Sequence, residues 1–162
     1  MKSRGFSLVE LMVVIAIIGI ILAVTTINYG SWMRKYGVEA QIKEMHNDLS
    51  NIRVKAIQSK MRHDVVFSPN NFVFRRFSTE GDVLGTQVFR KDLKYPIQYV
   101  TGGALQNFAA DLMTINTRGY TFNLYTIVIP GQPDASTDCL VVSTTRVNMG
   151  KYNATTQNCS FK

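Results

Sequence analysis

The chain has 162 residues, a formal net charge of +7, two cysteines and 46% hydrophobic residues. This length allows one globular domain with its own core, and the absence of a repeat or low-complexity tract excludes a repeat architecture. The positive charge is spread along the sequence, so it indicates acidic partners without choosing among nucleic acid, anionic lipid and acidic proteins.

The sequence opens on a strongly apolar segment, residues 5–29, which reads GFSLVELMVVIAIIGIILAVTTINY. Residues 6–29 would extend about 36 Å as a helix, enough to cross a bilayer. Glu10 is the only charge in this stretch. A carboxylate in a spanning helix costs about 2.5–3.5 kcal/mol, so a plain membrane anchor leaves Glu10 unexplained. A secretory signal is also disfavoured, because no good small-residue cleavage site follows the apolar run.

A third interpretation explains the acid. The residues K-S-R-G-F-S-L-V-E-L (2–11) resemble the class III prepilin leader of type IV pilin-like proteins. The resemblance implies that a prepilin peptidase cleaves between Gly5 and Phe6 and methylates the new amine of Phe6. Glu10 would be the fifth residue of the mature chain and would act in filament assembly.

The resemblance also divides the chain into three parts. Residues 1–5 would be a cleaved leader, and residues 6–29 a transmembrane helix that later enters the filament core. Residues 30–162 would form a periplasmic globular pilin domain that includes the second half of the helix. The basic residues Lys2 and Arg4 precede the apolar run, which favours a cytoplasmic start in the inner membrane.

Glu10 has a physical role in this scheme. Cleavage after Gly5 creates a positive amine at Phe6, and in a filament the carboxylate of Glu10 can pair with the Phe6 amine of a neighbouring subunit. Such a pair in an apolar bundle is strong and selects one axial stagger between subunits.

A second helical pattern follows the apolar segment. Apolar residues recur at spacings of three and four, which predicts one buried face of an amphipathic helix. The helix is expected to run from about residue 6 to about residue 61. The predicted face consists of Val38, Ile42, Met45, Leu49, Ile52 and Ala56.

The remainder reads as short strands separated by turns. We expect strands over 64–68, 72–77, 83–90, 94–100, 112–116, 120–129 and 139–144, with a hairpin turn at Thr-Arg-Gly (117–119). The strand over 139–144 is the last one that we assign, and the segment from Arg146 onward is short, polar and closed by Cys159. One long N-terminal helix packed against an antiparallel β-sheet is the α+β pilin fold.

Segments 51–67, 114–120 and 141–147 resemble the FimT/GspH group of minor pilins and pseudopilins, and Ile27 stands where many major pilins carry Pro.

The two cysteines, Cys139 and Cys159, predict a disulfide that closes a C-terminal loop, because an exported chain with one cysteine pair most simply oxidises it. Such a closure contributes about 3 kcal/mol. No cofactor and no metal site are expected, because no CxxC, G-x-S-x-G, Walker or HExxH motif occurs. His46 and His63 are interpreted as surface or boundary residues.

Basic residues with interleaved aromatics mark the C-terminal part. Such a surface can bind DNA through phosphates and stacking, although a solvated face is the alternative. Resemblance to FimT-like minor pilins implies DNA capture in natural transformation. The candidate residues are Arg118, Arg146, Lys151 and Lys162.

The predicted function is therefore a non-enzymatic filament subunit, a minor type IV pilin of the FimT/GspH kind. Its partners would be other pilin subunits, the prepilin peptidase, the inner membrane and, in the DNA hypothesis, nucleic acid. The alternatives are a pseudopilin of a type II protein secretion system and a membrane-tethered periplasmic enzyme.

Overall fold

The computed structural model describes residues 6–79 and 82–161, except for the side chains of residues 24–28. The predicted leader, residues 1–5, and Lys162 lie outside these ranges. The chain forms two compact units, Met1–Arg34 and Lys35–Lys162, and each is described by itself.

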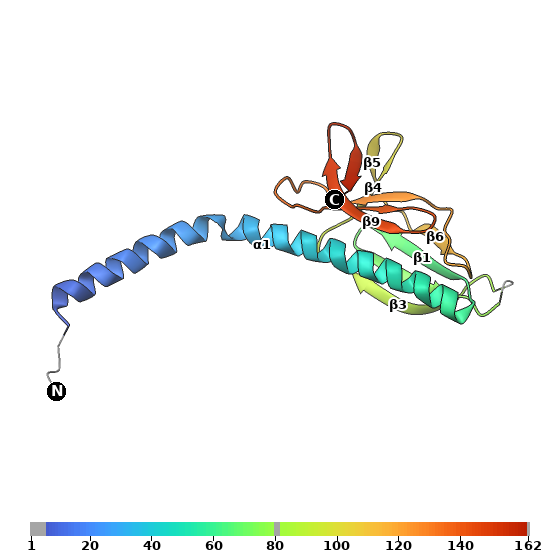
Figure 1. Cartoon of the computed structure of the whole chain (residues 1–162), viewed down its shortest axis with the longest axis horizontal. Coiled ribbons are helices and arrows are strands. Elements are labelled where there is room, and N and C mark those ends of the chain that lie inside the picture. The colour runs from blue at the N-terminus through green and yellow to red at the C-terminus, as the bar shows by residue number, and fades with distance from the viewer. Residues whose placement is uncertain (1–5, 80–81, 162) are drawn as a thin grey trace. The chain divides into compact units, whose positions relative to one another are not determined.

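The first unit is helical. Helix α1 begins at Leu8 and ends at Ser59, close to the predicted limits (Figure 1). The N–H of Leu11 donates to the carbonyl of Ser7 at 3.2 Å, which closes the first turn. Apolar side chains of this unit are exposed, with Phe6 at 78% and Ile20 at 67%, so within the described residues the unit buries no core of its own.

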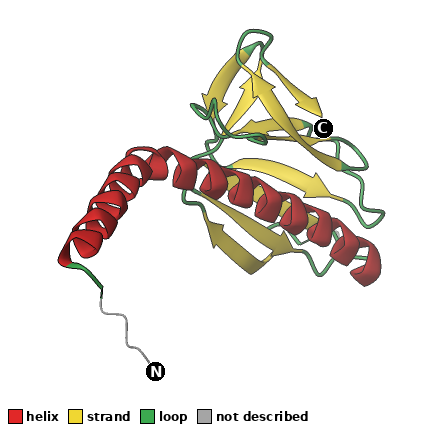
Figure 2. Cartoon of the chain, turned by 60° about the vertical axis from the view of Figure 1, so that its left-hand side comes forward, coloured by secondary structure: helices red, strands yellow, loops and turns green. Residues whose placement is uncertain are grey.

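The second unit holds the core, and the last part of α1 lies across its strands (Figure 2). The predicted apolar face of the helix is confirmed, because each of its residues is at most 2% exposed. These side chains pack against Phe67 and Phe72 and also against Ile127 and Leu140. The second unit therefore carries a continuous hydrophobic core that joins the helix to all its neighbouring strands.

The strands form two antiparallel sheets, whereas the sequence predicted one. The first has the order β3-β2-β1-β6 and the second the order β10-β9-β8-β7-β4-β5. The bounds are β1 His63–Ser68, β2 Asn71–Arg76, β3 Thr86–Asp92, β4 Gln98–Thr101, β5 Ala104–Asn107, β6 Asp111–Ile115, β7 Tyr125–Val128, β8 Cys139–Val142, β9 Val147–Asn153 and β10 Asn158–Phe161.

The division into two sheets arises between β6 and β7. The predicted turn at residues 117–119 is present, because the N–H of Asn116 donates to the carbonyl of Tyr120. The strands beside it do not form a hairpin, since β6 pairs with β1 and β7 pairs with β4 and β8. Beyond the turn itself, the bridge between Ile115 and Thr121 and the hydrogen bond from the N–H of Thr114 to the side chain of Asn123 join its two sides. The long strand expected over 120–129 is consequently short, and the two sheets instead share the helix as their common cover.

Two strands that were not predicted follow Arg146. Strands β9 and β10 form a hairpin with Cys159 opposite Tyr152 and Ser160 opposite Lys151. Strand β5 was likewise not expected, and it pairs with β4 through a turn in which Gly102 and Gly103 have φ of 56° and 79°. Positive φ at both central residues is the requirement of a tight two-residue hairpin, which glycine meets without strain.

Candidate functional site

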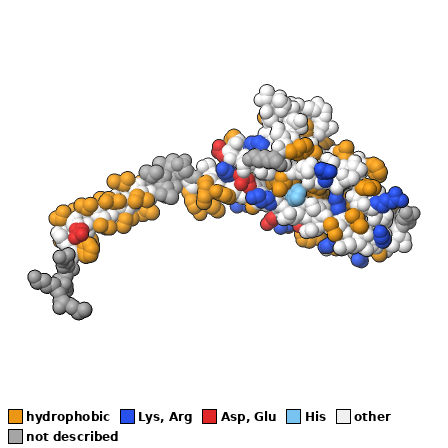
Figure 3. Space-filling model, in the orientation of Figure 1, with side chains coloured by type: hydrophobic (Ala, Val, Ile, Leu, Met, Phe, Trp, Pro, Cys, Tyr) orange, Lys and Arg blue, Asp and Glu red, His pale blue; other side chains and the backbone are white. Residues whose placement is uncertain are grey.

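The N-terminal turn of α1 carries the first candidate site. Glu10 lies in the first turn of the helix and is exposed. Its neighbours are apolar and equally open, with Phe6 at 78%, Leu8 at 75% and Val9 at 67%. Figure 3 shows apolar side chains covering this segment. A carboxylate in the first turn is favoured by the helix dipole, so Glu10 does not disturb the helix that carries it.

The carboxylate of Glu10 has no ion-pair partner within the described part of its own chain. Over residues 6–23 it is the only charged side chain. An isolated acid on an exposed apolar helix can be compensated only by a group from outside that helix. The geometry fits an intermolecular contact of the segment with other apolar helices.

The comparisons with known proteins agree at this segment. The family model for the prokaryotic N-terminal methylation motif matches residues 1–26. In this segment the chain resembles type IV pilin-like proteins. The motif implies processing by the prepilin peptidase and assembly with other pilin subunits. No curated protein and no solved structure shows a significant match to the chain.

The predicted transmembrane segment, residues 6–29, lies partly outside the described side chains, at residues 24–28. Among the residues that the structure describes, no helix combines the length and the apolar character that crossing a membrane requires.

The predicted C-terminal disulfide is confirmed. Cys139 of β8 and Cys159 of β10 are joined, with their Cα atoms 6.1 Å apart. Strand β9 lies between these two strands, so the disulfide passes over the middle strand of three. Gly150 of β9 leaves the necessary space, because a Cβ atom there would lie 2.9 Å from the Cys159 sulfur and 2.3 Å from the Ser160 carbonyl oxygen.

Gly150→Ala is therefore expected to destabilise the globular unit by about 2 kcal/mol, because the added methyl group must displace backbone as well as sulfur. Urea unfolding would measure the loss. Gly30→Ala is the matched control, since nothing lies within 4 Å of a Cβ at that position. Equal stability of the two variants would contradict the proposed steric role of Gly150.

Three of the four candidate DNA-binding residues lie in the described part of the chain. Arg118 and Arg146 are exposed on separate turns, and both turns contact the last part of α1. Gly119 approaches the side chain of Ile57, and Arg53 donates to the carbonyl of Ser143. Lys162 lies outside the described residues, and Lys151 lies within β9.

Lys151 forms an ion pair that the sequence did not predict. Its ammonium group lies 2.6 Å from a carboxylate oxygen of Asp138 and donates to the carbonyl of Gln132 at 2.6 Å. The other oxygen of Asp138 accepts the N–H of Tyr152 at 2.7 Å. The Asp138 side chain is 5% exposed. The cation of Lys151 therefore compensates a buried acid, and these residues line a cavity of about 600 Å³ beside the C-terminal hairpin.

A second acid fixes the loop that leads to Asp138. Glu39 of α1 accepts both the N–H and the hydroxyl of Ser136, each at 2.8 Å. The backbone hydrogen bond from Ser136 is the main reason that the pKa of Glu39 is lowered, and the nearby ammonium groups of Lys35 and Lys43 add to it. Glu39 thus ties the loop between β7 and β8 to the helix.

This contact gives the stability a pH dependence of known sign. The folded pKa of Glu39 is below its ordinary value of 4.5, so its stabilisation is present above pH 4.5 and is lost as the pH falls through the folded pKa. Glu39→Gln should flatten the decrease in melting temperature over this range. The effect should be small, because the group is mostly solvated. Identical acid profiles of wild type and variant would exclude the contact as a source of stability.

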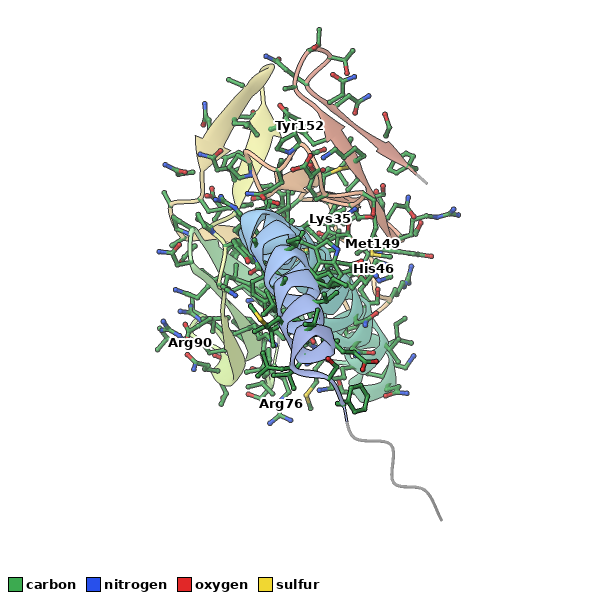
Figure 4. All side chains as sticks on the ribbon, turned by 90° about the vertical axis from the view of Figure 1, so that its left-hand side faces the viewer. Lys35, His46, Arg76, Arg90, Met149 and Tyr152 are labelled. Carbon is green, nitrogen blue, oxygen red and sulfur yellow. A yellow bond between two sulfur atoms is a disulfide. The ribbon has the colours of Figure 1, made fainter. Side chains whose placement is uncertain are left out.

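The two histidines occupy structural positions. His46 of α1 contacts the carbonyl of Val147 through Nε2 at 3.1 Å, and Figure 4 shows it beside Met149 of β9. The Nδ1 of His63 lies 3.0 Å from the carbonyl of Met61, and burial lowers the pKa of this imidazole. Within residues 6–79 and 82–161, no group of His, Cys, Asp or Glu side chains is arranged to hold a metal.

Proposed function

We propose that this chain is a minor type IV pilin of the FimT/GspH kind, a structural subunit that acts in pilus assembly. The observation that carries the proposal is the methylation motif joined to an exposed apolar segment, residues 6–23, whose single charged side chain is Glu10. The prepilin peptidase would cleave between Gly5 and Phe6 and methylate Phe6. The mature amine of Phe6 would then pair with Glu10 of a neighbouring subunit.

The disulfide supports placement of the globular unit in the periplasm, because stable disulfides form in oxidising compartments. Before assembly, the apolar segment would hold the subunit in the inner membrane. After assembly, it would line the core of the filament. No step of this function requires catalysis by the chain itself, so the proposed role is that of a subunit and not of an enzyme.

The mass of the native chain tests the processing step. We expect the purified protein to lack residues 1–5, to begin at Phe6 and to carry one additional methyl group. Gly5→Val should retain the leader, because the peptidase requires the small residue at the cleavage site. A native chain that still begins at Met1 would exclude the proposal and would favour the membrane-tethered enzyme.

The closest alternative is a pseudopilin of a type II protein secretion system, which uses the same helix and the same processing. Deletion of the gene separates the two. Loss of surface pili with normal protein secretion supports the pilus, and the reverse result supports the pseudopilus.

DNA binding is a second candidate function, favoured by the exposed guanidinium groups of Arg118 and Arg146. The structure makes Lys151 unsuitable for testing it, because removal of that residue leaves Asp138 unpaired. Arg118→Ala with Arg146→Ala in the full chain, kept in nonionic detergent, is the sharper variant. Unchanged affinity for duplex DNA over a salt series would remove these residues from the proposal.

A further inference from the structure

The loop between β2 and β3 is held in a fixed conformation by one carboxylate. Asp82 accepts hydrogen bonds from the N–H groups of Leu84 and Gly85, at 3.2 and 3.0 Å, and from the N–H and hydroxyl of Ser78. Gly85 has a φ of 61°, and a Cβ there would lie 2.8 Å from the Phe77 ring. The described part of the loop is therefore tied both to its own start and to the buried ring beneath it.

This conformation presents two aliphatic side chains to the outside. Val83 is 88% exposed and Leu84 is 83% exposed, the largest values among the large hydrophobic residues described in the globular unit. The loop holds these side chains in water, so the fold does not gain the stability that their burial would give. Exposed apolar groups of this kind mark contact surfaces. We call Val83 and Leu84 the aliphatic tip.

A cavity of about 410 Å³ adjoins the base of the same loop. Its lining combines cations with hydroxyl and amide groups and includes Lys60, Arg62, Phe77, Ser78, Thr79 and Asn116. The guanidinium group of Arg62 lies 3.8 Å from the centre of the Phe77 ring, which orients it. No carboxylate belongs to the described lining. Guanidinium, ammonium and hydroxyl donors around one space match the oxygens of a phosphate group.

We call this cavity the phosphate pocket, and further cations adjoin its lining residues in the sequence. Arg75 and Arg76 are exposed at the end of β2, next to Phe77, and Arg118 follows the lining residue Thr117. Figure 3 shows Lys and Arg side chains gathered at this end of the globular unit, and in Figure 4 Arg76 extends away from the ribbon.

Two acids of the described residues lie close by, and both contact other groups of the chain. Asp64 is 3.6 Å from Arg62, and Asp82 is satisfied by the loop. Glu80 and Gly81 lie outside the described residues.

We propose that the phosphate pocket and the aliphatic tip together bind an anionic phospholipid surface. A headgroup phosphate would enter the pocket, and Val83 and Leu84 would enter the boundary between headgroups and acyl chains. A basic cluster attracts anionic lipid, and adjacent apolar side chains add the affinity that a soluble anion would not use. The proposal does not depend on the filament function.

Co-flotation with vesicles tests the proposal. The full chain is held in phosphatidylcholine nanodiscs and mixed with vesicles of phosphatidylcholine alone or with half phosphatidylglycerol, at about 50 mM salt. Wild type should float with the anionic vesicles only.

Lys60→Gln with Arg76→Gln should weaken binding about 30-fold, from two lost cations. Val83→Ser with Leu84→Ser should weaken it about tenfold. Lys43→Gln with Lys94→Gln, two exposed lysines elsewhere, is the matched charge control and should change it less than about twofold.

Three results would overturn the proposal. Wild type could fail to float with anionic vesicles. The charge control could lose as much binding as the Lys60 and Arg76 variant. The serine variant could bind as well as wild type, which would show an anion site that does not engage lipid chains.

Lysine acetylation on wild type gives a readout independent of any substitution. Anionic vesicles should protect Lys60 several-fold and leave Lys43 unchanged. Equal protection of Lys60 by inorganic phosphate or by an oligonucleotide, at matched ionic strength and without vesicles, would assign the pocket to a soluble ligand and reject the lipid surface.

Discussion

Glu10→Ala should reduce incorporation of the subunit into filaments by at least about 100-fold. The reason is the environment of the charges after assembly. Removal of one member of a buried ion pair costs about 3–5 kcal/mol, because the remaining charge, here the amine of Phe6, is left uncompensated in an apolar surrounding. At about 1.4 kcal/mol for each tenfold change, this corresponds to a loss of 100-fold or more.

The measurement is the amount of subunit in sheared filaments relative to the amount in the cell. Glu10→Gln should behave like Glu10→Ala, because the amide keeps the shape and loses the charge. Ser7→Ala, one turn away on the same exposed segment, is the control and should assemble normally. The mass of each variant must begin at Phe6, so that a failure of cleavage is not mistaken for a failure of assembly. Incorporation of Glu10→Ala at the wild-type level would exclude the ion-pair mechanism.

Lys151→Met should lower the free energy of unfolding by about 3 kcal/mol, although a surface lysine normally contributes little. The side chain of Asp138 is almost fully buried, and Lys151 supplies its only compensating cation among the described residues. An unpaired buried carboxylate is costly, whereas methionine retains most of the apolar stem that lysine packs against the hairpin.

Urea unfolding of three variants would test this assignment. Lys151→Met alone should be the least stable. Lys151→Met with Asp138→Asn should regain part of the loss, because the amide carries no charge and can still accept the N–H of Tyr152. Arg146→Gln, at an exposed position, should lie within about 0.5 kcal/mol of wild type. Equal stability of Lys151→Met and wild type would show that Asp138 does not need its cation.

The helical part of the fold was predictable because its signal is local. The apolar residues from Val38 to Ala56 repeat at the helical period, and burial follows directly from that period. The leader was predictable for a similar reason, since Gly5, Phe6 and Glu10 stand in a fixed register. The disulfide followed from the number of cysteines.

The sheets were less predictable because their pairing is not local. The sequence around residues 117–119 reads as a hairpin turn, yet β6 gains more from pairing with β1 and from burying Met113 and Ile115. Strand β9 was missed because its residues are mostly polar, and its place is set by neighbouring strands and by the disulfide over Gly150. The role of Lys151 was not predicted, because its partner Asp138 is 13 residues away in the sequence and comes next to it only when the strands pair.

The disulfide also bears on how the subunit would respond to a mechanical load. Cys139 and Cys159 are 20 residues apart in the sequence and are linked directly. If the two ends of the chain were pulled apart, force would pass from one sulfur to the other and bypass the intervening segment. About 70 Å of extended backbone would stay out of the load path. The C-terminal hairpin would then lengthen by only a small amount before a covalent bond had to break.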